Sequence, residues 1–129
     1  MCIRDSLYRI DATKKGDISP ELGEIGAKGK PNPNSGQIWH YGGQNAEGEE
    51  LFGRTMSTVS IADGMCYAAD LTGFVHCLDV ESGKRHWRHD LLSGVWGSTL
   101  VCDGKVFIGN EDGILTVLRH SKDLSLIHI

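Results

Sequence analysis

Three of the histidines, the four cysteines and several aspartates beside glycines are the residues of this sequence that could do chemistry. His86 and His89 flank Trp87 on an expected strand, and residues three apart on a strand point to opposite faces of its sheet. That spacing argues against one shared metal ion. We therefore interpret His76, His86 and His89 as solvated or interface side chains.

The cysteines stand at positions 2, 66, 77 and 102, and no two have the Cys-x-x-Cys spacing of a zinc site. If the turn over 70–73 pairs the residues on either side of it, Cys66 lies directly opposite Cys77. A cross-strand disulfide is then conceivable in an oxidising compartment. The positions forty residues later are the plain apolar pair Val106 and Val117. We therefore favour two small buried thiols.

The aspartates are expected to have backbone roles. Asp63, Asp70, Asp103 and Asp112 all stand at expected turns, where aspartate and its neighbouring glycine tolerate positive φ. No cluster of carboxylates suggests a calcium site. The sequence therefore assigns no catalytic, cofactor-binding or metal-binding residue.

A forty-residue repeat organises the second half of the chain. The segment ADGMCYAADLTGFVHCLD (62–79) aligns without a gap on CDGKVFIGNEDGILTVLR (102–119). Asp63-Gly64 then falls on Asp103-Gly104, and Gly73 falls on Gly113. Each unit divides into short strands, which are expected for the first unit over 57–62, 65–69, 74–80 and 84–91.

Four antiparallel strands in a repeat of about forty residues are typical of a β-propeller blade. The Asp-Gly pairs supply two-residue hairpin turns between the first two strands of each unit. A helical repeat would need helical periodicity, and none is present. We therefore predict an all-β fold, a partial β-propeller of about two to two and a half blades.

The segment LDVESGKRHW (78–87) resembles the tryptophan-docking motif of the PQQ-like β-propeller repeats. The matching residues are Leu78, Asp79, Ser82, Gly83, Lys84 and Trp87. The segment over 95–118 resembles the following blade and begins at Trp96-Gly97. We expect Trp87 to cover apolar surface between blades while its indole N–H finds a backbone acceptor, rather than to be an ordinary half-buried tryptophan.

The resemblance is fairly specific over 54–119 and weaker over 7–41, where Trp39 stands three residues after Gly36 rather than four. A segment rich in glycine and proline over 16–36 is expected to be an inserted loop. The expected organisation is outer strands of a preceding blade (7–53), a complete blade (54–93) and part of a following blade (94–123). Such a section would expose sheet faces that missing blades cover.

The two ends of the chain are expected to be foreign to it. LSLIHI (124–129) can be encoded by nucleotides whose reverse complement, shifted by one base, encodes Met-Cys-Ile-Arg-Asp, and the chain begins MCIRDS. This nucleotide pair resembles a transposase end used to prepare sequencing libraries. We therefore interpret residues 1–6 and 124–129 as translated adapter. The alternative is a natural start and a short terminal strand.

Composition limits the partners. The net charge of −4 gives no indication of nucleic acid, and no apolar run approaches the roughly 20 residues of a membrane span. The expected partners are the missing blades of the full-length chain, and other proteins that bind its blade loops.

The resemblance implies three classes of function. The first, which we prefer, is a non-catalytic propeller scaffold or protein-binding module, similar to the outer-membrane assembly lipoproteins. The second is a sector of a PQQ- and calcium-dependent alcohol or sugar dehydrogenase, and the third is a sensor domain fused to another enzyme. PQQ and calcium are expected only under the second, and the adjacent cysteine pair of the alcohol dehydrogenases is missing from this sequence. The resemblance also implies a periplasmic or secreted location.

Overall fold

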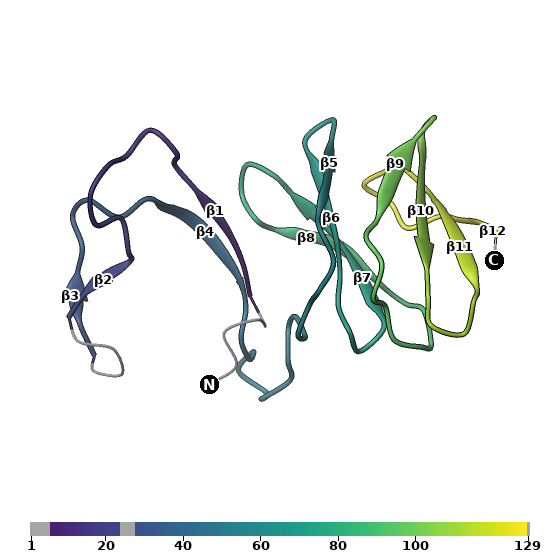
Figure 1. The fold of residues 1–129 in the computed structure, drawn as a ribbon, viewed down its shortest axis with the longest axis horizontal. Helices are drawn as coiled ribbons and strands as arrows, with labels where there is room; N and C mark the ends of the chain where they lie inside the picture. The colour runs from purple at the N-terminus through teal and green to yellow at the C-terminus, as the bar shows by residue number, and fades with distance from the viewer. Residues whose placement is uncertain (1–5, 24–27, 129) are drawn as a thin grey trace.

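The computed structural model describes residues 6–23 and 28–128, and the described residues form strands and loops without a helix. The described strands form four sheets, one of them a small hairpin. Figure 1 shows the three larger sheets side by side, in chain order from the N-terminal to the C-terminal end. Each of these three sheets is a blade or part of one, so the predicted all-β, partial-propeller architecture is confirmed. None of the described residues belongs to a helix that could cross a bilayer.

The second blade is complete and has strand order β5-β6-β7-β8. Its strands are β5 (Ser60–Ala62), β6 (Met65–Ala69), β7 (Phe74–Asp79) and β8 (Arg85–Asp90). The β5–β6 turn is the expected two-residue hairpin, with φ of 48° at Asp63 and 75° at Gly64. The expected first strand began at 57, but β5 begins at Ser60, and the Thr58 N–H donates to the Ser98 hydroxyl of the next blade rather than to β6.

The β6–β7 register corrects the expected opposition of the two cysteines. Asp70 N–H donates to the Phe74 carbonyl, and Gly73, at φ 102°, donates to the Asp70 carbonyl. These bonds close a three-residue loop, one residue shorter than the loop over 70–73 that the sequence suggested. Cys66 therefore pairs with Leu78 and Cys77 pairs with Tyr67. The two thiols lie on opposite faces of the sheet and are not bonded to each other.

The third blade repeats the second and has strand order β9-β10-β11-β12. Its strands are β9 (Leu100–Cys102), β10 (Lys105–Gly109), β11 (Leu115–Arg119) and β12 (Leu126–His128). The last strand consists of residues that the sequence assigned to adapter. β12 pairs with β11, as a short terminal strand would. The interpretation of residues 124–129 as translated adapter stays a prediction.

The first blade contributes a two-stranded sheet, β1 (Ser6–Ile10) with β4 (Gln37–Gly42). The segment between them is the expected insertion and carries a small hairpin, β2 (Glu21–Leu22) with β3 (Lys30–Pro31). The side-chain amide of the buried Asn32 stabilises the base of this insertion by donating hydrogen bonds to the backbone carbonyls of Asp17 and Ser19.

Two apolar cores lie between the blades. The core between the second and third blades includes Tyr67, Val75 and Trp87 from one blade with Val106 and Leu118 from the other. The core between the first and second blades includes Tyr41, Phe52, Cys66, Ala68 and Leu78. Alternate side chains of β6 and β7 enter different cores, so the second blade is buried on both faces.

Candidate functional site at the blade interfaces

A tryptophan from the outermost strand of each of the first two blades docks on the next blade. The indole N–H of Trp87 donates to the Ser121 carbonyl at 3.0 Å, and the ring is 7% exposed. The indole N–H of Trp39 donates to the Val80 carbonyl at 2.8 Å. Trp87 therefore has the inter-blade role expected of it. Trp39 has the same role, although its spacing departs from the motif.

The rest of the motif builds the turn that receives such a tryptophan. Oδ1 of Asp79 accepts hydrogen bonds from the backbone N–H groups of Ser82 and Glu81 and from the Ser82 hydroxyl. The backbone bond from Ser82 is the main cause of the lowered pKa of Asp79. Gly83, at φ 72°, lies against the ring of Trp39. The Lys84 carbonyl accepts from the Asp79 N–H and closes the turn.

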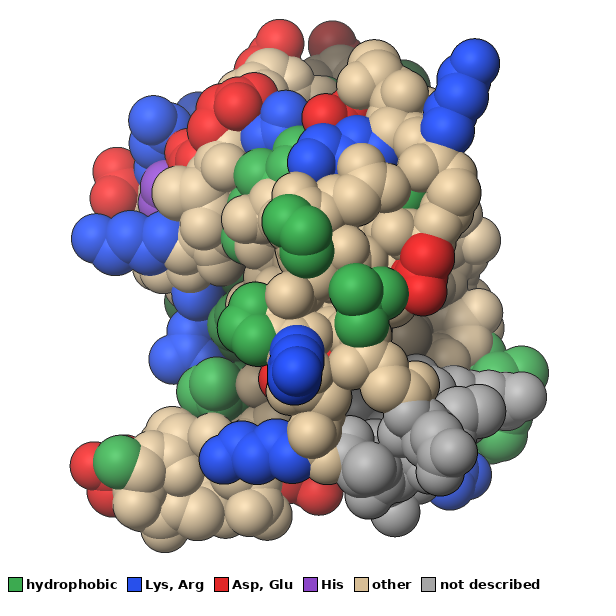
Figure 2. Space-filling view, turned by 90° about the vertical axis from the view of Figure 1, so that its left-hand side faces the viewer, with side chains coloured by type: hydrophobic (Ala, Val, Ile, Leu, Met, Phe, Trp, Pro, Cys, Tyr) green, Lys and Arg blue, Asp and Glu red, His purple; other side chains and the backbone are tan. Residues whose placement is uncertain are grey.

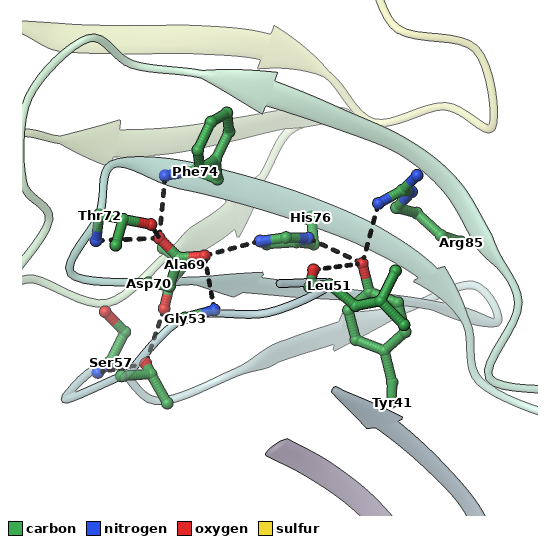
Figure 3. A network of polar contacts seen from close by, with 11 residues as sticks. Tyr41, Leu51, Gly53, Ser57, Ala69, Asp70, Thr72, Phe74, His76 and Arg85 are labelled. Atoms are coloured by element: carbon green, nitrogen blue, oxygen red, sulfur yellow. Dashed lines mark hydrogen bonds and ion pairs between the residues drawn. The ribbon is translucent and has the colours of Figure 1, made fainter. Parts of the chain in front are cut away.

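A buried polar network joins the first and second blades (Figure 3). Nε2 of His76 lies 2.9 Å from Oδ2 of Asp70, and Nδ1 lies 3.0 Å from the Tyr41 hydroxyl. This hydroxyl is also within hydrogen-bonding distance of the Leu51 carbonyl and accepts from Arg85 at 3.3 Å. The side chains of His76 and Asp70 are each 1% exposed.

Asp70 is saturated with donors. Its Oδ1 accepts from the Thr72 hydroxyl and from the N–H groups of Thr72 and Phe74, and its Oδ2 accepts from the Gly53 N–H. Burial, the largest single effect, raises the pKa of Asp70, but the bonds from His76, Thr72, Phe74 and Gly53 together outweigh it and set the pKa at about 2. Asp70 therefore has the expected turn role and a second, inter-blade role.

Burial also shifts the pKa of His76, the histidine bonded to Asp70. It lowers the pKa of this histidine, and the hydrogen bond to Asp70 opposes the shift only in part. His76 is then neutral at neutral pH, with Nε2–H donating to Asp70 and Nδ1 accepting. The sequence predicted an interface or solvated histidine, and the structure places His76 in the interface.

A second chain of the same composition joins the second and third blades. The Tyr67 hydroxyl lies 2.8 Å from Nδ1 of His120, whose Nε2 lies 2.9 Å from Oδ2 of Asp63. Tyr67 is fully buried, while the Asp63 side chain is 83% exposed. Sequence reasoning missed both tyrosines and His120. The sequence offered one indication of a polar contact between blades: the repeat position that holds Asp70 in the second blade holds Asn110 in the third, and both residue types fit a turn.

A short polar ladder joins the inner ends of the second and third blades. The Ser57 hydroxyl donates to the Gly97 carbonyl at 2.6 Å, and the Thr58 N–H donates to the Ser98 hydroxyl at 2.9 Å. The partners in each bond are forty residues apart, so the bonds link equivalent positions of neighbouring blades. Gly97 thus contributes its carbonyl to this interface.

The other predicted motif residues lie where the repeat places them. Trp96 is 61% exposed and donates to Glu111 at 3.0 Å, so it is not docked like Trp87. Asp103-Gly104 forms a hairpin turn like its counterpart, and Gly113 closes the β10–β11 turn at φ 80°. His86 lies 3.8 Å from Asp79, whereas His89 lines a small cavity against the third blade.

The described residues do not gather the side chains of a metal centre. They contain no group of three or more His, Cys, Asp or Glu side chains able to hold an ion. Asp70 is the most buried carboxylate, and its oxygens are already occupied by protein donors. Cys66 and Cys77 lie on opposite faces of a sheet and cannot lie together against a ring. What the arrangement does is hold one blade to the next.

No protein-family model matches this chain. Over 94 residues the chain is 33% identical to the 1-butanol dehydrogenase (cytochrome c) of Thauera butanivorans, a match covering 64% of this chain and 13% of that protein. It is similar to the structure of quinohemoprotein alcohol dehydrogenase ADHIIG from Pseudomonas putida HK5, with a TM-score of 0.52 and 23% identity, over 68% of this chain and 15% of that one.

The chain is also similar to BamB from Moraxella catarrhalis, with a TM-score of 0.56 and 18% identity, over 74% of this chain and 28% of that one. It therefore spans 13% to 28% of the lengths of these three proteins. Four-stranded blades, docked tryptophans and these matches show that the chain is a section of a β-propeller similar to the PQQ-like propeller proteins. The resemblance drawn from the motifs is confirmed.

Proposed function

We propose that this section serves its full-length protein as a non-catalytic scaffold whose blade loops bind other proteins. The observation that carries the proposal is the use of the buried polar groups. Asp70 and His76 are inaccessible and bonded to the neighbouring blade, so they stabilise the interface and offer no atom to a substrate.

The missing blades of the full-length chain are proposed as the first partners. The end of the molecule formed by β1 and β4 exposes Tyr8 (55%), Ile10 (56%) and Ile38 (49%). Figure 2 looks onto this end and shows several apolar side chains along the middle of the face, with a basic side chain among them and other charged side chains around them. Such a face is typical of a covered interface. A periplasmic or secreted location is part of the proposal.

A second candidate is a sector of a PQQ- and calcium-dependent alcohol or sugar dehydrogenase. The 33% identity to a 1-butanol dehydrogenase favours it. Since the described residues contain no cluster of metal-ligating side chains, the groups that bind calcium and the quinone would come from the rest of the protein. In that case these blades position the site without touching it.

One experiment separates the two candidates. The gene is sequenced outward from the codons for 7–123, and the full-length protein is purified and titrated with PQQ and Ca²⁺. The scaffold predicts no saturable change in the quinone spectrum and no dye-linked alcohol oxidation. Saturable quinone binding together with alcohol oxidation would replace the scaffold with the dehydrogenase.

A further inference from the structure

A cavity of about 170 Å³ lies between the second and third blades. Its surface is mostly apolar, and Leu91 and Thr116, which line it, are buried. Leu92, Ile114 and His89 also line it. The described residues that form the cavity all lie within 89–116, so its walls do not depend on the missing blades of the full-length chain.

One residue of the cavity wall is the counterpart of a residue that fills the preceding interface. The bond from the Leu71 N–H to the Arg54 carbonyl recurs forty residues later, so Leu92 corresponds to Phe52. Phe52 is 1% exposed and belongs to the core between the first and second blades. Leu92 is 88% exposed at φ 64°, and its N–H donates to Oδ1 of Asp90. Its side chain therefore does not fill the interface as Phe52 does.

Two more residues of the cavity wall have aromatic counterparts at the preceding interface. The forty-residue offset makes Thr116 the counterpart of His76. Strand pairing makes His89 the counterpart of Tyr41, since each lies two residues after a docked tryptophan. The positions that hold three rings at one interface thus hold a histidine, a threonine and an outward-turned leucine at the next.

The three rings pack together at the preceding interface. The ring centroid of Phe52 lies 4.9 Å from that of His76 and 6.0 Å from that of Tyr41. Tyr41 and His76 point toward one another (Figure 3), with centroids 5.7 Å apart. The cavity therefore corresponds to the space of the Phe52 ring. A dry apolar cavity of about 150 Å³ is large enough to hold benzene, so this cavity has room for one aromatic ring.

Charge at the cavity specifies the ligand further. Asp90 and Asp112 line it, and neither lysine nor arginine is present among the described residues that do. Both aspartates are exposed, so a substituent that extends from the ring toward solvent would pass close to their carboxylates. A positive substituent would be attracted there and a negative one repelled.

We propose that the cavity binds a small molecule with one aromatic ring and a positively charged amino group, of the arylmethylamine class. The ring would lie against Leu91 and Ile114, in the space that corresponds to Phe52, with the amino group near Asp90 and Asp112. This site goes beyond the proposed scaffold function, because a ligand held between two blades is not a partner bound by blade loops.

The test is a titration of the 129-residue chain with three probes of similar shape, benzylamine, benzyl alcohol and benzoate. Near neutral pH the first is a cation, the second is neutral and the third is an anion. Two-dimensional ¹H–¹⁵N NMR spectra follow binding, and we expect saturable shifts of the Leu92 and Ile114 amides with a Kd of about 1 mM or lower for benzylamine.

The order of the three probes tests the charge of the site. Benzyl alcohol should bind about threefold more weakly than benzylamine, and benzoate about tenfold or more, because the carboxylates attract the cation and repel the anion. Benzoate that binds as tightly as benzylamine would overturn the proposal. Lack of saturable benzylamine binding would also overturn it, without affecting the scaffold function, which the PQQ titration tests.

Three chain variants locate the site. Thr116→Phe places a ring in the cavity and should abolish benzylamine binding. Leu100→Phe adds the same ring at a position that is 59% exposed and outside the cavity, and should change the Kd by less than about twofold. Asp112→Asn should weaken benzylamine binding by about threefold and leave benzyl alcohol binding unchanged.

Circular dichroism checks the fold of each variant. If Thr116→Phe does not fold, the comparison of the two probes on Asp112→Asn still decides the location. Unchanged benzylamine binding in folded Thr116→Phe, or in Asp112→Asn, would overturn the proposal.

Discussion

Trp39 of the first blade lies directly against Gly83 of the second, so that a Cβ on Gly83 would stand 2.6 Å from Cδ2 of the indole. The glycine and the tryptophan of one motif therefore act at different interfaces. Gly83 receives the tryptophan of the preceding blade, whereas Trp87, four residues later, docks on the following blade. The motif over 78–87 therefore connects three blades rather than two.

Replacing Gly83 should destabilise the fold more than replacing a glycine that has only an unusual φ. Gly83→Ala combines a left-handed backbone, which costs about 1–2 kcal/mol, with overlap on Trp39, which adds about 1–3 kcal/mol. Gly104→Ala is the matched control, because Gly104 has φ 66° and open space around it. Urea unfolding gives both values, and equal losses would show that the indole contact is unimportant.

Trp87→Phe should lower the free energy of unfolding by about 1–2 kcal/mol, because the Ser121 carbonyl loses its donor and a small cavity forms. Trp96→Phe is the control: this indole is mostly exposed, and its loss should change stability by no more than about 0.5 kcal/mol. Thermal unfolding followed by circular dichroism compares them. If both variants lose the same stability, Trp87 is not a docking residue.

Cys66 and Cys77 should be present as unreactive thiols. Burial raises the pKa of Cys66, and it raises the pKa of Cys77 to about 12, so neither forms the reactive thiolate at neutral pH. We expect a thiol reagent to label Cys102 in the folded chain, and to label Cys66 and Cys77 only after denaturation without reductant. Peptide mass mapping locates the label. A requirement for reductant at both buried positions would show a disulfide.

Much of the fold could be predicted because the repeat is regular in sequence. The Asp63-Gly64 pair fixed a two-residue turn, and strands on both sides followed from alternation and length. The register after Asp70 could not be read, because DLTG is compatible with loops of three or four residues. The three-residue loop is selected by the backbone hydrogen bonds of Asp70 and Gly73, which would break if the β6–β7 register shifted by one residue.

The interface chemistry was less accessible to sequence reasoning. Asp70 and Asn110 look interchangeable at a turn, yet they have opposite partners. Asp70 accepts from the Gly53 N–H, whereas the Asn110 amide donates to the Leu91 carbonyl. The difference comes from whether the preceding loop presents an N–H or a carbonyl, and that depends on tertiary structure rather than on the residues of the turn.

Asp70 and His76 should make the stability of the chain decrease as the pH falls. Both have a lowered pKa in the folded state, so the unfolded chain binds protons more readily than the folded chain below the unfolded values of about 6.5 for His76 and 3.9 for Asp70. Stability is fully present above about pH 7. It should decline as the pH falls below about 6.5, and by about 2–3 kcal/mol more between about pH 5 and 1 as Asp70 is protonated.

Asp70→Asn tests the assignment of the lower step. An asparagine cannot accept from both the Gly53 N–H and His76 Nε2–H while keeping its bonds to the turn, so we expect a loss of about 2–3 kcal/mol at pH 7. The variant should also lose stability less steeply than the original chain between pH 4 and 2. Asp112→Asn, at an exposed turn of the third blade, should retain the full acid dependence. Urea midpoints measured from pH 2 to 8 give all three curves. An unchanged slope in Asp70→Asn would mean that other carboxylates, and not this inter-blade network, carry the acid sensitivity.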